Sequence, residues 1–380
     1  MDFRPSDEQE IQRRTVREFA EAEMRPHVME WDEAQQFSAD LLPKLAALGL
    51  MGIQFAEEYG GSAMSAVDYC ICIEELARVD PGVALSVAAH NGLCAAHLNM
   101  FGSDAQKATY LPRLVKGEVL GAWGLTEASA GSDAAAMRTT ATRQGDCWVL
   151  NGAKAFITHG AVGGVMVVMA VTDRSKGNRG ISAFILEHGT PGMRAGKKEN
   201  KLGMRASDTS EVVFEDCRLP SGQMLGEAGQ GFINTLQVLD AGRIGIAALS
   251  VGLAQGAYEA ARSYAKERHQ FGQPIAAFQA IQWKLADAAT KIEASRLLTY
   301  RAAYLKDQGK RMTKESAMAK LYASETAVRV ADDCVQIHGG YGFVKDYPAE
   351  KYFRDVKLLT IGEGTSEIQR LVIARQLLTS

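Results

Sequence analysis

The sequence is poor in the residues that build disulfide frameworks and metal sites. None of its six cysteines belongs to a C-x-x-C pair, and its seven histidines are dispersed without an H-E-x-x-H spacing. A chain of 380 residues can bury a large apolar core, so it does not need disulfides for its stability. We therefore expect reduced thiols, a cytoplasmic location and no bound metal.

An excess of one charge and long apolar runs are also missing. The formal net charge is -3 and the charged residues of both signs are interspersed, which leaves no electrostatic footprint for nucleic acid. No apolar run reaches the roughly 20 residues that a membrane helix needs. The first ten residues, MDFRPSDEQE, are acidic and do not resemble a signal or transit peptide. These absences predict a globular protein that neither binds nucleic acid nor inserts into a membrane.

Common nucleotide-binding and nucleophile motifs are absent too. The chain has no G-x-x-x-x-G-K-[ST] loop, no G-x-G-x-x-G between a strand and a helix, and no G-x-S-x-G elbow. A P-loop, a dinucleotide-binding fold of the Rossmann type and an α/β-hydrolase are therefore not indicated.

The patterns that are present divide the chain into three regions. Residues 1–120 contain near-continuous apolar segments such as VDYCICIEELARVD, which are typical of buried helices. Residues 121–230 contain short β-rich runs such as GVMVVMAVT and GISAFILE, which predict a small antiparallel β barrel or sandwich. Residues 231–380 contain four helical patterns, which predict an antiparallel four-helix bundle. The predicted fold class is α+β and mostly α, with an N-terminal helical domain, a middle β domain and a C-terminal bundle.

One dipeptide predicts a specific turn inside the β region. Asn151-Gly152 lies between the two halves of CWVLNGAKAFIT. This dipeptide favours a type I′ turn, because it tolerates positive φ at both central positions. We therefore expect a hairpin there.

The stretch IGEGTSEIQR places one carboxylate, Glu363, between two glycines just ahead of a helix. Ser366 and Gln369 have the spacing of a capping box, so we expect the helix to start beside this loop. Taken alone, Glu363 is most simply explained as an acidic residue that complements the helix dipole. The flanking glycines favour a second explanation, in which the backbone passes close to a ligand.

Four further stretches can each be explained as structural elements. WGLTEASAGSD can be a solvated turn, AFIT a strand end, ERHQFGQPIAAFQ a helix connector and QIHGGYGF a helix stop. Their joint occurrence, in this order on an α-β-α framework, closely resembles the acyl-CoA dehydrogenase family of flavoproteins over essentially the whole chain. The most specific marks are LTEASAGSD, RHQFGQPIAAFQ, QIHGGYGF followed by YPAEKYFRD, and GEGTSEIQRLVIAR.

The resemblance implies a reaction and a cofactor. Members of this family convert an acyl-CoA thioester to the trans-2-enoyl-CoA, bind FAD, and pass electrons to electron-transfer flavoprotein. A carboxylate takes the α proton and the β hydride goes to flavin N5. In the commonest arrangement the base is the glutamate of the E-G-T-S motif, which matches Glu363. A carboxylate shielded from water should have a raised pKa, as such a base requires. The backbone N–H of that glutamate and a flavin hydroxyl then stabilise the enolate-like transition state.

The resemblance also assigns binding residues, position by position. Those matched to FAD are Trp123, Leu125, Thr126, Ser132, Phe156, Thr158, Arg268, Phe271, Phe278, Gln279, Gln336, Gly340, Thr365 and Glu367. Those matched to the acyl-CoA are Ser132, Asp240, Arg243 and Gly364. The segment around Arg268 and the segment around Gln336 match residues that reach the FAD of a neighbouring subunit. The resemblance therefore implies a homo-oligomer, at least a dimer and in this family usually a tetramer.

Two positions depart from common family patterns. Gly242 stands where some branched- and long-chain members carry their base, which leaves Glu363 as the only matched base. Gly362 stands where many members carry tyrosine, so we expect extra room for a branched or bulky short acyl group. Oxidases of this fold carry a further C-terminal domain and desulfinase-like members lack the glutamate, so neither fits. A non-enzymatic helical scaffold is the alternative from another class, and bound flavin would exclude it.

Overall fold

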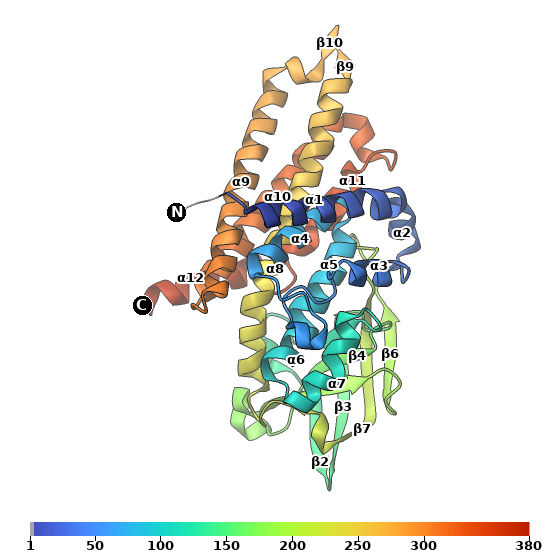
Figure 1. The fold of residues 1–380 in the computed structure, drawn as a ribbon, viewed down its shortest axis with the longest axis vertical. Coiled ribbons are helices and arrows are strands. Elements are labelled where there is room, and N and C mark those ends of the chain that lie inside the picture. The colour runs from blue at the N-terminus through green and yellow to red at the C-terminus, as the bar shows by residue number, and fades with distance from the viewer. Residues whose placement is uncertain (1–3, 380) are drawn as a thin grey trace.

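The computed structural model describes residues 4–379. Helices fill one half of the molecule and a β-sheet fills the other, as Figure 1 shows. One long helix, α8 (Gly231–Glu267), runs through both halves and lies against α4 (Ala66–Val79). This architecture confirms the predicted fold class.

The N-terminal helices start where short polar side chains cap them. Ser6, Ser65 and Ser103 each form a capping box directly before the first residue of a helix, and Asp80 caps the helix that begins at Pro81. Helices α4 and α5 are buried along almost their whole length, as their apolar sequences predict. The helices of this region are α1 (Asp7–Phe19), α2 (Val28–Ala34), α3 (Leu41–Ala47), α4, α5 (Pro81–Ala89), the π-helix η4 (His90–Ala95), α6 (Ala96–Phe101) and α7 (Asp104–Val115).

The middle region forms one eight-stranded sheet with the order β6-β7-β3-β2-β4-β5-β8, and β1 pairs with β4. Most neighbours are antiparallel, but β1 and β2 each run parallel to β4, so the sheet is mixed rather than purely antiparallel as predicted. The strands are β1 (Gly121–Gly124), β2 (Thr140–Gln144), β3 (Cys147–Thr158), β4 (Val165–Val171), β5 (Ile181–Glu187), β6 (Met193–Lys198), β7 (Thr209–Pro220) and β8 (Met224–Leu225).

The hairpin predicted at Asn151-Gly152 is wrong. The turn is made by the two residues between Gln144 and Cys147, which pair across β2 and β3. Asn151 lies inside β3 instead, where its side chain donates to Asp216 Oδ1 at 3.2 Å and accepts from the Asp216 N–H at 2.8 Å. The pairing of β3 with β7 shifts register here, so Gly152 with φ +143° forms an irregularity in the strand. Long-range strand pairing has overridden the local turn preference.

The C-terminal region is a bundle in which α8 and α9 flank α10, and α12 packs on α10. Among residues 4–379, α8 is the one helix long and apolar enough to cross a membrane, but 72% of its apolar window is buried inside the protein. It is therefore the central core helix of the bundle. The elements are α8, β9 (His269–Gln270), β10 (Gln273–Pro274), α9 (Gln279–Asp307), α10 (Thr313–His338), α11 (Ala349–Asp355), the 3₁₀ helix η10 (Val356–Thr360) and α12 (Ser366–Leu378).

Candidate active site

Glu363 lies on the short turn between η10 and α12. The cap of α12 is Thr365, whose Oγ1 accepts a hydrogen bond from the Ile368 N–H at 3.3 Å. The predicted capping box of Ser366 and Gln369 is therefore wrong by one residue. Gln369 points back to the turn instead and donates to its carbonyls. The helix start fixes the position of the turn, as the sequence suggested, but through a different side chain.

The turn has an unusual backbone. Glu363 has φ +51° and Gly364 has φ +95°, so two consecutive residues occupy the left-handed region. That region is rarely adopted by side-chain-bearing residues, and such strain persists only where the surroundings impose it. The conformation directs the Glu363 carboxylate onto α8, where a Cβ on Gly242 would overlap Oε2 of Glu363. Gly242 is therefore the residue that lets the carboxylate approach the helix.

The Glu363 carboxylate can gain or lose a proton near neutral pH. Oε2 of Glu363 is buried and has no hydrogen-bond partner among the described residues. Burial raises the pKa of Glu363 to about 7, and the positive charges of Lys320 and Arg243 oppose this rise. A carboxyl group with this pKa is a candidate general base.

Arg243 lies one residue beyond Gly242 and is itself buried. Its Nη1 donates to Asp240 Oδ1 at 2.6 Å, and the second oxygen of Asp240 accepts from Thr313 Oγ1 at 2.5 Å. Asp240 and Arg243, which are three residues apart on α8, thus form an ion pair on one face of the helix. Nε of Arg243 is buried without a hydrogen-bond partner among residues 4–379, and the positive charge of Arg243 acts on the Glu363 carboxylate.

Tyr69 forms a wall beside the carboxylate that the sequence analysis did not identify. A Cβ on Gly245 would lie 2.6 Å from the Tyr69 hydroxyl, and one on Gly92 would lie 3.4 Å from it. Burial and the neighbouring Glu363 carboxylate both raise the pKa of Tyr69. Because Gly242 and Gly245 are one helical turn apart, the phenol lies next to the carboxylate along α8. Two glycines three residues apart inside a long helix were the available sequence signal.

Six of the residues matched to the flavin lie on β1 and β3 or in the segment that follows β1. Trp123 Nε1 donates to His97 Nδ1 at 3.1 Å, and the carbonyl of Thr126 accepts from the Ala155 N–H at 2.9 Å. Phe156 has φ +58° and an aromatic side chain that is 64% exposed. Leu125 is buried, Thr158 is half-buried and Ser132 is exposed. An exposed aromatic ring held by a strained backbone fits a flat ring system that would cover it.

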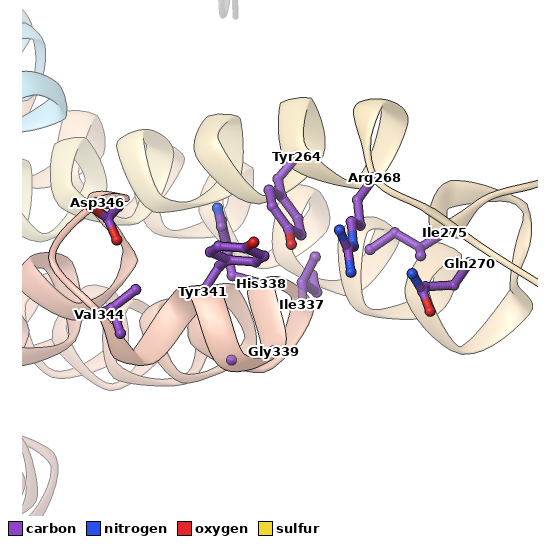
Figure 2. Close-up of a pocket in the computed structure, with 11 residues that line it drawn as sticks. Tyr264, Arg268, Gln270, Ile275, Ile337, His338, Gly339, Tyr341, Val344 and Asp346 are labelled. Atoms are coloured by element: carbon purple, nitrogen blue, oxygen red, sulfur yellow. The ribbon is translucent and has the colours of Figure 1, made fainter.

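A second group lies at the other end of the molecule. Figure 1 shows β9 and β10 at the tip of the bundle, in the half opposite to β3. Arg268 and Gly340 help to line a cavity of about 640 Å³ here. Figure 2 shows Tyr264 and Arg268 reaching from the end of α8 toward the segment that carries His338 and Tyr341. Phe271 is 92% exposed at the tip. Near it in the chain are Phe278, which is half-buried, and Gln279, which is exposed; Gln336 is exposed on the last turn of α10.

One chain therefore does not bring all the matched flavin residues together. Phe156 on β3 and Phe271 beyond β9 belong to opposite halves of the fold. Thr365 and Glu367 lie at the start of α12, beside Glu363. No described cluster of three or more His, Cys, Asp or Glu side chains in residues 4–379 could hold a metal ion.

Profiles of three protein domains match the chain in sequence order. They are the N-terminal, middle and C-terminal domains of acyl-CoA dehydrogenase, at residues 6–118, 122–217 and 229–378.

Individual relatives match over the full length. A short-chain specific acyl-CoA dehydrogenase of Clostridium acetobutylicum is 48% identical over 374 residues, which are 98% of this chain and 99% of the relative. The butyryl-CoA dehydrogenase structure from Megasphaera elsdenii is 45% identical, with a TM-score of 0.97 and full coverage of both chains. A chain solved in work on the electron transferring flavoprotein of Acidaminococcus fermentans and flavin-based electron bifurcation is 48% identical, with a TM-score of 0.99 and full coverage of both chains. This chain therefore belongs to the acyl-CoA dehydrogenase family of FAD-dependent oxidoreductases.

Proposed function

We propose that this protein removes one hydrogen from Cα and one from Cβ of a short-chain acyl-CoA, with Glu363 as the base that takes the α proton. The observation that carries the proposal is the Glu363 carboxylate, whose Oε2 is buried without a hydrogen-bond partner in the described part of the chain and whose pKa is raised to about 7. The names of the similar dehydrogenases support a short acyl chain.

The residues around Glu363 support this role. The deprotonated carboxylate accepts the α proton at Oε2, and burial strengthens it as a base for a weak carbon acid. Lys320 and Arg243 keep part of the population ionised at neutral pH, because their charges oppose the effect of burial. The Tyr69 phenol, which packs against Gly92 and Gly245, would help to exclude water from the space beside the carboxylate.

The residues present fit the cofactor of the family. Bound FAD supplies the hydride acceptor for the β hydrogen. The exposed Phe156 ring would cover the flavin, and the Arg268 guanidinium is suited to a pyrophosphate. Within residues 4–379, no atom lies within 4 Å of a Cβ placed on Gly339 or Gly340, so the backbone at the cavity is open to a ligand. Trp123, Leu125, Thr126, Ser132 and Thr158 would hold the cofactor from the sheet.

We further propose that two subunits share each cofactor. The strand β3, which carries Phe156, and the strand β9, which follows Arg268, lie in opposite halves of the fold (Figure 1), and this separation supports a partner subunit that supplies the second group. A dimer is the smallest assembly that satisfies this arrangement, and a tetramer is the proposed state. Electron-transfer flavoprotein is the proposed electron acceptor, which the similarity to the A. fermentans chain supports. The six free cysteines agree with a cytoplasmic location.

A panel of acyl-CoA thioesters tests the proposed function. The purified protein should be yellow, and butyryl-CoA should reduce its flavin in the absence of oxygen and support turnover with an artificial acceptor. A colourless protein, or one whose flavin no acyl-CoA reduces, would contradict the proposal and favour a scaffold role.

Arg268→Ala should weaken cofactor retention and subunit association together. Arg268 is exposed in the single chain, so its loss should leave the fold of the chain intact. Bound cofactor stabilises only the state that holds it, so losing a cross-subunit contact should also favour dissociation. Flavin content and size-exclusion chromatography measure the two effects. Arg143→Ala, another exposed arginine, is the control, and unchanged flavin content and size in Arg268→Ala would remove the shared-site proposal.

Gly362→Tyr should shift specificity toward linear acyl groups. The atoms nearest to a Cβ here belong to Leu358, at ordinary contact distances of 3.6–3.7 Å, so a side chain can be added beside Glu363. Without a tyrosine ring at this position, the pocket has space for additional acyl groups. Each methylene-sized group that fills it should contribute roughly 1–3 kcal/mol to the binding free energy. The measurement is the ratio of kcat/KM for isobutyryl-CoA and butyryl-CoA. A ratio that Gly362→Tyr leaves unchanged means that Gly362 does not set specificity.

A further inference from the structure

The conformation of the Glu363–Gly364 turn depends on side chains from outside the turn. Glu363 and Gly364 both have positive φ. Glycine adopts such angles readily, but a glutamate does not, so local preference alone does not keep the turn in this conformation. The turn carbonyls must also be satisfied, because buried polar groups without hydrogen bonds are costly. Two fully buried polar side chains, one on α10 and one on α12, supply these bonds.

Lys320 is the first of these side chains. It is 0% exposed, and its Nζ donates to the Gly364 carbonyl at 2.7 Å. The other fully buried lysines serve as ion-pair partners: Lys154 pairs with Glu127 at 2.8 Å and Lys351 with Asp355 at 2.6 Å. The ammonium of Lys320 instead donates to a backbone carbonyl of the turn. Lys320 therefore differs from these two lysines, whose ammonium groups pair with carboxylates.

Gln369 is the second. It is also 0% exposed, and its Nε2 donates to the Gly364 carbonyl at 2.9 Å and to the Glu363 carbonyl at 3.3 Å. A Cβ on Gly364 would lie 2.7 Å from this nitrogen, so glycine is required at Gly364 for space as well as for its φ of +95°.

We propose that Lys320 and Gln369 are positioning residues for the base: together they hold two successive peptide planes of the turn and so aim the Glu363 carboxylate at Gly242. The proposal rests on the proposed function of Glu363. Lys320 has a second effect, because its ammonium is one of two cations that act on the carboxylate, while Gln369 adds no charge.

The charged and titratable groups that face Glu363 come from three elements. The two cations are Arg243 on α8 and Lys320 on α10, and the third titratable group is the neutral Tyr69 phenol on α4. Arg243 already donates to Asp240 at 2.6 Å, so part of its charge is compensated. Lys320 therefore makes the larger contribution to keeping Glu363 ionised, and burial lowers the pKa of Lys320 itself to about 8.

Three variants of the full-length holoprotein test the two roles separately. Lys320→Met removes the charge and the donor, Lys320→Gln keeps an amide donor without the charge, and Gln369→Met removes a neutral donor. Glu363 is titrated by infrared difference spectroscopy, with Glu363→Gln as the blank. Thermal unfolding and flavin content check that each variant is folded and loaded.

Both lysine variants should raise the midpoint of the Glu363 titration by about one pH unit, since an opposite charge nearby shifts a pKa by one to three units. The pH profile of kcat/KM with butyryl-CoA should shift by the same amount.

Gln369→Met should leave the midpoint unchanged and lower kcat/KM by about tenfold or more at every pH, because the carboxylate is misplaced. A wild-type midpoint in both lysine variants together with wild-type kcat/KM in Gln369→Met would overturn the proposal. The infrared titration needs no turnover, so it separates this proposal from a failure of the proposed function.

Discussion

Glu363→Gln is expected to fold, to bind FAD and to lose acyl-CoA dehydrogenation by a factor of about 10²–10⁴ or more. The amide has nearly the same shape as the carboxylate but cannot accept the α proton. Gly242, the position matched to the base of some branched- and long-chain members of the family, offers no side chain. The measurement is the rate at which butyryl-CoA reduces the flavin in rapid mixing without oxygen.

Glu58→Gln is the control for this substitution. Glu58 is an exposed glutamate outside the site, so its variant should behave as wild type. If Glu363→Gln reduced its flavin at close to the wild-type rate, another group would have to be the base.

Gly242→Ala should produce the second large effect. Glycine to alanine inside a helix ordinarily stabilises a protein by roughly 0.5–1 kcal/mol. Here the new Cβ would overlap Oε2 of Glu363, so the carboxylate has to move. A displacement of this kind can cost about 100-fold in rate. We therefore expect kcat/KM to fall by about that factor while the temperature of unfolding changes little.

The double variant Gly242→Ala/Glu363→Gln separates this mechanism from a general disturbance. If Gly242 acts only by making room for the carboxylate, adding Gly242→Ala to Glu363→Gln should cause no further loss. Gly222→Ala is the control, because its Cβ would meet no atom within 4 Å. Activity of Gly242→Ala equal to wild type would mean that the carboxylate needs no such space.

The sequence predicted much of the architecture because its strongest signals are long and periodic. The buried helices α4 and α5 follow from apolar segments that no exposed helix could carry. The glycines beside Glu363 favoured a backbone that passes close to a ligand, which stays a prediction, and the structure shows that Gly364 has φ +95°. The hairpin at Asn151-Gly152 failed because pairing with β7 extends β3 through this dipeptide. Turn propensity is a local signal, and a neighbouring strand can override it.

The residues that surround Glu363 were harder to find. Tyr69, Lys320 and Gln369 lie on three different helices, and each looks like an ordinary helical residue in the sequence. Their importance depends on how α4, α10 and α12 pack against α8, which no local pattern encodes. A lysine inside an alanine-rich apolar helix, as in ESAMAKLYASE, was the one available hint.

Exchange of the α hydrogens tests the central claim, that Glu363 takes the α proton, most directly. Butyryl-CoA is incubated with the holoprotein in ²H₂O without an electron acceptor, and deuterium at Cα is measured by mass spectrometry. The ionised carboxylate is the active form, so wild-type exchange should rise with pH and reach half its maximum near pH 7, as the pKa of about 7 requires. Glu363→Gln should incorporate no deuterium above the rate in buffer. Exchange by Glu363→Gln at the wild-type rate would contradict the assignment of Glu363 as the base.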